Sequence, residues 1–128
     1  MLNNAAVHPT LPVVNLERAK KFYQEVLGLK VIQEDPSPGA MLQAGKGTSI
    51  YIYQRAATKA DHTAVAFEVA DVEATVKELK SKGVQFEDVD SPGLKTVNGI
   101  ATMATPKGEF KGAWFKDTEG NIIAIANM

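Results

Sequence analysis

The chain contains no cysteine, and several other features that would indicate a function are also missing. Without cysteine it can form no disulfide, no thiolate nucleophile and no cysteine-ligated zinc site. Its first residues show no basic segment followed by an apolar one, so we expect no secretory signal. No apolar run approaches the roughly 20 residues that a membrane-spanning helix needs. We therefore expect a cytoplasmic protein without a membrane partner.

The chain also lacks an excess of either charge. Its 14 lysine and arginine residues against 15 aspartate and glutamate residues give a net charge of −1. This balance excludes the basic surface of a non-specific nucleic-acid binder, so no nucleic-acid partner is expected. The length of 128 residues and the hydrophobic share of 45% indicate one globular domain.

Two segments in the two halves of the chain have the pattern of amphipathic helices. The first runs from Asn15 to Gly28 and the second from Asp71 to Gly83. Each begins with a residue whose side chain can cap a helix, and each ends at a glycine suited to the left-handed position after a helix. Glutamates four residues before lysines predict ion pairs along the helices, at Glu17–Lys21, Glu73–Lys77 and Glu78–Lys82.

Similar β-rich segments flank both helices. They precede the helices at 7–14 and 63–69, follow them at 29–34 and 84–89, and close the halves after Gly47 and Gly120. The closing segments alternate, so that neighbouring residues point to opposite faces of a sheet. The pattern predicts an α+β fold of two tandem βαβββ modules within a single domain over residues 1–128. Module one spans about residues 1–56 and module two about residues 60–128.

The segment from Asp90 to Gly112 is less regular than the rest. Turn-forming clusters stand at 91–93 and 105–108, and Asn98-Gly99 has the composition of a two-residue hairpin turn. The segment therefore predicts a short extra hairpin or a mobile flap. Its role in function is left open.

The sequences HPTLPVVNLERAKKFYQEVLGLKV at 8–31 and WFKDTEGNIIAI at 114–125 resemble two signatures of one family. This is the vicinal oxygen chelate superfamily, the glyoxalase/bleomycin resistance protein/dioxygenase group. The resemblance covers nearly the whole chain. It implies a curled, cup-shaped mixed sheet with the helices on the outer face, and it implies a homodimer. Open sheet edges, which need to be covered, also favour a homodimer.

In metal-dependent members of this family, four strands each carry one His, Glu or Gln ligand. These are the first and last strands of each module. Carried over residue by residue, the four positions are His8, Tyr51, Ala64 and Ala124. The alanines offer no donor atom, and a protonated tyrosine coordinates metals poorly. Because a metal site needs three or four ligands, we interpret the inherited site as degenerate and expect no cofactor.

Two nearby residues could in principle restore ligands to the second half. His62 is about 6.6 Å along the strand from Ala64, and Glu68 is about 13 Å away in the other direction. Neither distance allows direct replacement of a ligand at Ala64.

The same positions predict an organic pocket. Small residues opposite tyrosine and histidine would leave an apolar space with a few polar groups. The expected ligand-binding residues are His8, Tyr51, Tyr53 and Trp114. Trp114 could instead be a dimer contact or an anchor within the sheet, and the tyrosines could be ordinary strand residues.

These observations favour a metal-free protein that binds a small organic molecule. The alternative is a lyase, isomerase or dioxygenase of the glyoxalase type, dependent on divalent Zn, Ni, Mn or Fe. A third possibility is an enzyme without metal that uses His8 or Tyr51 as acid or base. The sequence leaves open whether the protein catalyses a reaction, and it names no substrate.

Overall fold

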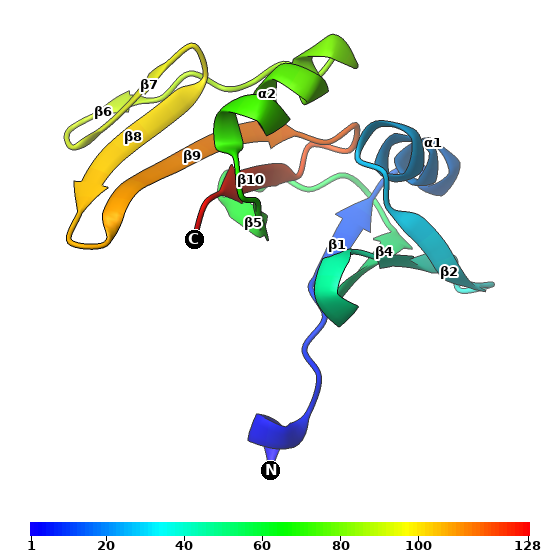
Figure 1. Cartoon of the computed structure of the whole chain (residues 1–128). Coiled ribbons are helices and arrows are strands. Elements are labelled where there is room, and N and C mark those ends of the chain that lie inside the picture. The colour runs from blue at the N-terminus through cyan, green and yellow to red at the C-terminus, as the bar shows by residue number, and fades with distance from the viewer. The chain divides into compact units, whose positions relative to one another are not determined.

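The computed structural model describes residues 1–128 and shows an α+β protein with two mixed sheets (Figure 1). The chain divides into two compact units, Met1–Lys59 and Ala60–Met128. The cup implied by the resemblance would involve both units and stays a prediction. None of the helices combines the length and the apolar character needed to cross a membrane.

The first unit has the predicted βαβββ order. Its main elements are β1 (Thr10–Val13), α1 (Leu16–Lys21), β2 (Lys30–Asp35), β3 (Gly39–Gln43) and β4 (Ser49–Gln54). A π-helical turn, η2 (Phe22–Val26), extends α1, and short 3-10 turns lie at Leu2–Asn4 and Gly45–Gly47. The strand order is β1-β4-β3-β2, with β1 parallel to β4 and the other pairs antiparallel.

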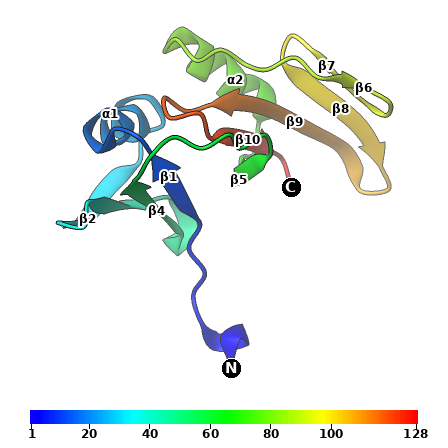
Figure 2. The ribbon, with the colours of Figure 1, turned by 180° about the vertical axis from the view of Figure 1, so that it is seen from behind.

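The second unit repeats this plan with additional strands. Its elements are β5 (Thr63–Glu68), α2 (Val72–Ser81), β6 (Asp90–Ser91), β7 (Leu94–Val97), β8 (Ile100–Thr105), β9 (Gly108–Lys116) and β10 (Ile122–Ala126). The strand order is β5-β10-β9-β8-β7-β6, with β5 parallel to β10. The view from behind shows how β6 to β8 extend this sheet beyond β9 (Figure 2).

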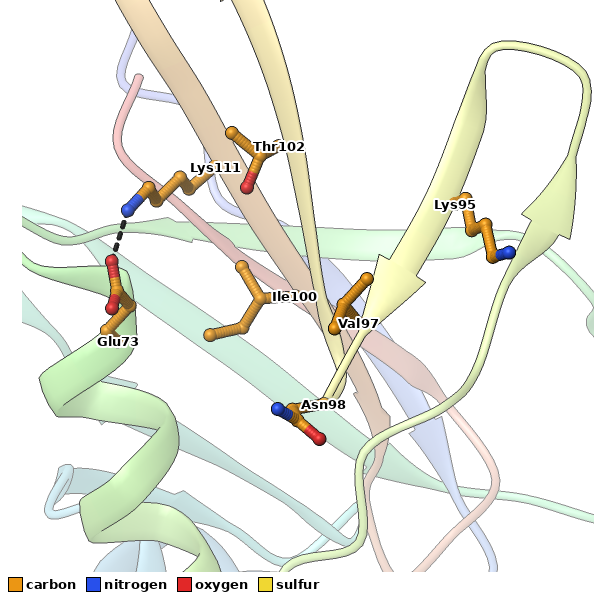
Figure 3. A pocket seen from close by; sticks show the side chains of 7 residues that line it. All are labelled: Glu73, Lys95, Val97, Asn98, Ile100, Thr102 and Lys111. Carbon is orange, nitrogen blue, oxygen red and sulfur yellow. Dashed lines mark hydrogen bonds and ion pairs between the residues drawn. The ribbon is translucent and has the colours of Figure 1, made fainter.

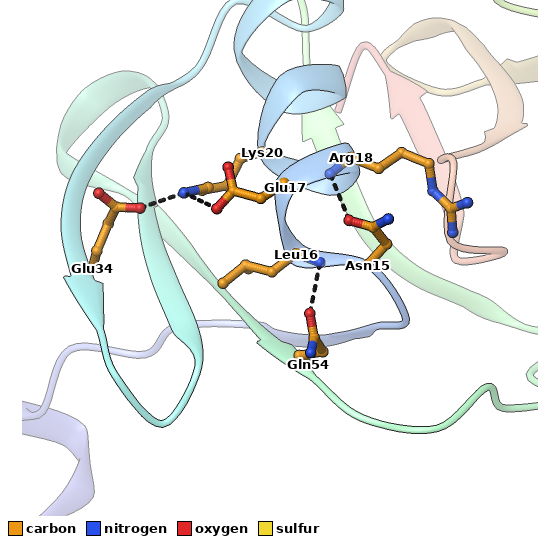
Figure 4. Close-up of polar contacts among 7 residues, drawn as sticks. All are labelled: Asn15, Leu16, Glu17, Arg18, Lys20, Glu34 and Gln54. Carbon is orange, nitrogen blue, oxygen red and sulfur yellow. Dashed lines mark hydrogen bonds and ion pairs between the residues drawn. The ribbon is translucent and has the colours of Figure 1, made fainter.

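Both helices begin where capping residues predict. The Asn15 side chain accepts a hydrogen bond from the Arg18 amide at 3.0 Å (Figure 4). The Asp71 side chain accepts one from the Ala74 amide, also at 3.0 Å. These bonds satisfy amides that have no partner within the helix. Gly28 lies after the first helix with φ of 76°, as its predicted role requires.

Each sheet buries one face against its own helix. In the first unit the alternate residues of β1, β3 and β4 pack with Leu16, Ala19 and Tyr23 of the helix, and the strand residues are Leu11, Val13, Ala40, Leu42, Ile50 and Ile52. In the second unit Val76 and Leu79 of α2 are buried with Phe115, Ile123 and Ile125. Because side chains alternate along a strand, the opposite faces carry the candidate site residues.

Two sequence predictions about strands are wrong. Residues 84–89 form no strand and make only a single bridge, Phe86 to Phe115 on β9. Residues 108–112 of β9 are already paired with β8, so only a short part of that edge of β9 is available to residues 84–89. The expected strand 7–14 is shorter, because β1 begins at Thr10 and Val7 is 86% exposed.

The predicted ion pairs also differ, because longer-range partners compete with the helix neighbours. Glu17 pairs with Lys20 rather than Lys21, at 2.9 Å. Glu73 pairs with Lys111 on β9 rather than with Lys77. The predicted pair Glu78–Lys82 is confirmed at 3.9 Å.

The segment from Asp90 to Gly112 contains the predicted extra hairpin. Asn98 and Gly99 form the turn between β7 and β8 with φ values of 54° and 83°. These positive angles are what a two-residue hairpin turn requires. A Cβ on Gly99 would lie 2.9 Å from the Phe86 Cβ, so the turn packs closely against Phe86.

Candidate functional site

His8 lies just before β1, on the face of the sheet that points away from α1. The Tyr51 amide donates to the Pro9 carbonyl at 2.9 Å, which continues the parallel ladder below β1. His8 Nδ1 and Ser49 Oγ share a hydrogen bond of 2.6 Å. Ser49 is 8% exposed, whereas the His8 side chain is exposed. One ring nitrogen of His8 is therefore engaged by the protein itself.

Tyr51 lies on this same face, next to Thr10 in the parallel pair of β1 and β4. Its hydroxyl donates to Asp35 Oδ2 at 2.9 Å, and Gln33 donates to the other carboxylate oxygen at 3.1 Å. The Tyr51 ring reaches Asp35 by crossing Gly39, the residue of β3 opposite Asp35. Tyr51 thus holds a structural hydrogen bond.

Tyr53 is the neighbouring tyrosine on this face and pairs in register with Pro12 and Gly39. It is half-buried, and its hydroxyl makes no hydrogen bond within the protein. Of the two tyrosines, Tyr53 is therefore the one whose hydroxyl remains available to a ligand.

In the second unit, Ala124 lies between Ala66 on β5 and Trp114 on β9. Residues paired in register share one face of a sheet, so these three side chains lie side by side. Ala124 is 7% exposed, Trp114 is half-buried and Ala66 is exposed. Trp114, the only tryptophan, therefore flanks the alanine that the family resemblance assigns to the fourth ligand position.

Gly112 separates two aromatic rings on this face. A Cβ at Gly112 would lie 3.4 Å from the Phe110 ring and 3.6 Å from the Trp114 ring. Gly112 also pairs in register with Ala126 and Ala101, both buried. The face thus combines a floor of small residues with two aromatic side chains, which is the composition of many small-molecule pockets.

Ala64 is placed less simply than the sequence suggests. The register of β5 and β10 shifts between Ile122, paired with Thr63, and Ile123, paired with Val65. Ala64 is consequently the extra residue of a bulge and has no partner on β10. His62 is exposed before the strand, and Glu68 is exposed opposite Ala126.

The four inherited positions do not fit a divalent metal ion. His8 alone carries a strong donor atom, Tyr51 donates its hydroxyl proton to Asp35, and the two alanines have methyl groups. Elsewhere too, no three His, Cys, Asp or Glu side chains gather in a way that could hold a metal. Metal sites in proteins need three or four ligands in a defined geometry.

The two lysines with raised pKa values lie outside this candidate site. Hydrogen bonds to Glu34 and then to Glu17 raise the pKa of Lys20 above 10.5, although burial opposes the shift (Figure 4). A hydrogen bond to Glu73 raises the pKa of Lys111. Both pairs tie a helix to its sheet on the helix side.

Four residues that matter for these faces were not identified from the sequence: Ser49, Asp35, Phe110 and Gly112. The first, third and fourth could have been found, because residues two or four apart on one strand share a face with Tyr51 or Trp114. Asp35 is on another strand, and its contact with Tyr51 depends on the register of the sheet.

A protein-family model described as glyoxalase/bleomycin resistance protein/dioxygenase superfamily matches residues 5–125. The chain belongs to this superfamily. Superfamily members often bind divalent metals. A comparison with curated protein sequences gives no significant match.

Three solved structures illustrate how widely this fold occurs. An integron cassette protein from the mobile metagenome of the Halifax Harbour sewage outfall has a TM-score of 0.72 at 19% identity, covering 98% of this chain and 99% of its own. A mutant fosfomycin resistance protein, FosX, from Listeria monocytogenes has a TM-score of 0.71 at 17% identity, covering 97% and 90%. Lactoylglutathione lyase from Agrobacterium tumefaciens has a TM-score of 0.68 at 16% identity, covering 96% and 92%.

Proposed function

We propose that this superfamily member binds a small organic molecule without a metal ion. The proposal rests on the residues that lie next to Ala124. At a position where metal-dependent relatives would carry a ligand, there is a methyl group flanked by Ala66 and Trp114. Removing a carboxylate there removes charge and opens volume, while the indole offers a large flat apolar surface.

The side chains available to hold a metal ion in the first unit support the same proposal. FosX from Listeria monocytogenes was solved with Mn(II) and a dihydroxypropylphosphonic acid. In this chain Tyr51 is engaged with Asp35, and His8 is the remaining donor among the inherited positions. His8 and the free hydroxyl of Tyr53 are then polar groups that can orient an organic ligand.

Metal content and metal titration test the first half of the proposal. Protein purified without chelators should contain no stoichiometric Zn, Ni, Mn or Fe, and added divalent ions should bind no more tightly than to an isolated surface histidine. A His8→Ala variant is the matched control, since it removes the one donor. Tight, stoichiometric metal that is lost in this variant would overturn the proposal in favour of the metalloenzyme.

Tryptophan fluorescence tests the second half. Trp114 is the only tryptophan, so the emission reports directly on the face around Ala124. In a screen of small aromatic and aliphatic molecules, a true ligand should change the emission saturably. Ala66→Leu places a larger side chain in the space beside Ala124, so it should weaken this binding. Ala104→Leu, at an exposed position of β8, should leave it unchanged.

We also propose that the chain works as a homodimer in the cytoplasm. The outer edges of β1 and β5 have a neighbour on one side only, and open edges favour association. A cysteine-free composition suits a reducing compartment. Light scattering at micromolar concentration should give twice the chain mass of 13.8 kDa, and a mass of one chain would contradict the dimer.

A further inference from the structure

The two-residue turn between β7 and β8 consists of an asparagine followed directly by a glycine, Asn98 and Gly99 (Figure 3). Asn98 is exposed, and its side-chain amide makes no hydrogen bond within the protein. The side chain borders a cavity of about 380 Å³ between α2 and the β7–β8 hairpin. The amide is therefore accessible to water and free to change its rotamer.

An asparagine that precedes a glycine can lose its side-chain amide without an enzyme. The backbone nitrogen of the glycine gives its proton to solvent and attacks the asparagine Cγ. The Cγ–Nδ2 bond then breaks, and ammonia leaves with a proton from solvent. Water opens the resulting cyclic imide at either carbonyl, which yields aspartate or isoaspartate. In total, water is consumed and ammonia is released, with no oxidation or reduction. Glycine favours this ring closure because it has no Cβ to hinder the approach.

The attacking nitrogen, that of Gly99, is not engaged elsewhere. Gly99 is buried, yet its N–H donates no hydrogen bond within the protein. Most buried backbone amides in folded proteins have such a partner. The Gly99 nitrogen consequently loses no internal hydrogen bond when it reacts.

The folded turn nevertheless keeps this nitrogen away from the side chain that it would attack. The φ angles of 54° at Asn98 and 83° at Gly99 are those of a type I′ turn. In such a turn the ψ angle of the first residue is about 30°. The Gly99 nitrogen then lies on the far side of the Cα–C bond from the Asn98 Cβ, whereas the imide needs both on the same side. The ring can therefore close only when the peptide unit between the two residues rotates.

Two contacts oppose this rotation. Lys80 Nζ, at the end of α2, donates to the Asn98 carbonyl at 3.1 Å. This carbonyl belongs to the same peptide unit as the Gly99 nitrogen. On the glycine itself, an added Cβ would lie 2.9 Å from the Phe86 Cβ, so Gly99 packs closely on Phe86. Both contacts exist in the closed turn and are lost on rotation, so the reaction rate follows the population of the open turn.

We propose that Asn98 is a site of spontaneous deamidation, whose rate is controlled by the contact between Lys80 and the turn. Isoaspartate carries the backbone through the side-chain carbons and so lengthens the chain between the Cα of residue 98 and the Gly99 nitrogen. A type I′ turn joins its strands through two residues of ordinary backbone, so the longer turn displaces Gly99 from Phe86 and loosens the hairpin. The reaction also adds one negative charge to the turn.

The test incubates the whole chain at mildly alkaline pH and follows its asparagines by peptide mass spectrometry. The fragment that contains Asn98 should gain the mass difference between an amide and an acid. Asn121 is the internal control, because the bulky Ile122 follows it. Lys80→Met should speed the conversion of Asn98 about threefold, since it removes one exposed hydrogen bond from the closed turn. Lys77→Met, at an exposed lysine of the same helix, should leave the rate unchanged.

Unfolding in urea separates the reactivity of the sequence from the effect of the fold. Without the turn, the unmodified protein and Lys80→Met should convert Asn98 at one common rate, faster than in the folded protein. Conversion of Asn98 no faster than that of Asn121 would overturn the proposal. Equal or slower conversion in folded Lys80→Met, or a difference that persists in urea, would overturn it as well.

The structural consequence is tested on the converted protein, which its added charge allows to be separated. Hydrogen exchange of β7 and β8 should be faster in the isoaspartate form than in the unmodified chain, because the turn no longer packs on Phe86. Exchange of β4, in the other unit, should be the same in both forms. Equal exchange of β7 and β8 in the two forms would overturn the proposed loosening of the hairpin.

Discussion

The Tyr51 ring lies directly over Gly39. A Cβ on Gly39 would come within 2.6 Å of Tyr51 Cζ, a distance that no side chain tolerates. The ring takes this path to reach Asp35 on β2, to which its hydroxyl donates. Tyr51, which the family resemblance predicts at a ligand position, is therefore part of the sheet's own packing. Gly39 on the neighbouring strand β3 makes that packing possible.

Gly39→Ala should lower the free energy of unfolding by about 1–3 kcal/mol, because the added methyl group displaces the Tyr51 ring. In a Tyr51→Ala background the same substitution should have little effect. Gly45→Ala is the matched control, since a Cβ there meets no atom within 4 Å. Urea unfolding of the four combinations measures the coupling, and equal effects in both backgrounds would refute the contact.

Gly99→Ala should destabilise the β7–β8 hairpin for two reasons. Alanine is disfavoured at φ of 83°, and its Cβ would meet the Phe86 Cβ. Gly93→Ala provides the comparison, because its φ of 80° is similar while no atom lies within 4 Å. Gly99→Ala should lower the free energy of unfolding by about 1–3 kcal/mol more than Gly93→Ala, and this difference measures the packing on Phe86. Hydrogen exchange of β7 and β8 should accelerate more in that variant, and identical exchange in both would argue against the anchor.

Asp117→Ala should loosen the turn between β9 and β10. Asp117 is 6% exposed, and its Oδ1 accepts hydrogen bonds from the amides of Glu119 and Asn121 at 2.8 and 2.9 Å. Buried donors left without an acceptor cost about 1–3 kcal/mol each. Thr118→Ala, at the exposed neighbour, should change the melting temperature little. A similar melting temperature for both variants would contradict this role.

Lys20 should stabilise the first unit in a pH-dependent way. Its pKa is raised in the folded protein by Glu34 and Glu17. Its contribution is therefore complete at pH values below the ordinary lysine pKa of 10.5 and is lost as the pH rises through the raised value. Lys20→Met should lower the unfolding free energy by about 1 kcal/mol at neutral pH.

The difference in unfolding free energy between Lys20→Met and the unmodified protein should become smaller above pH 10.5. Lys21→Met is the matched control, because Lys21 is exposed on the same helix and forms no ion pair. Urea unfolding between pH 7 and pH 11 measures both variants. A constant difference across this range would show that the ion pairs contribute nothing.

The sequence by itself determined the elements whose signals are local. The caps at Asn15 and Asp71, the turn at Asn98-Gly99 and the alternation along β4 and β10 all depend on residues a few positions apart. Hydrogen-bond capping, positive φ angles and strand periodicity are properties of short segments, so they can be read without knowing the fold. The two family signatures indicated a superfamily because one covers the first strand and helix of module one and the other covers the closing strand of module two.

Tertiary structure alone decided which of these residues meet. Glu73 pairs with Lys111, 38 residues away, because β9 brings that lysine closer than the helix neighbour. Tyr51 is engaged by Asp35, and Ala64 falls in a bulge, because of strand register. Long side chains bind the nearest suitable partner in space, and a shift of one residue changes the face on which a side chain lies. The residue types at the expected ligand positions could be read from the sequence, whereas the neighbours of these residues could not.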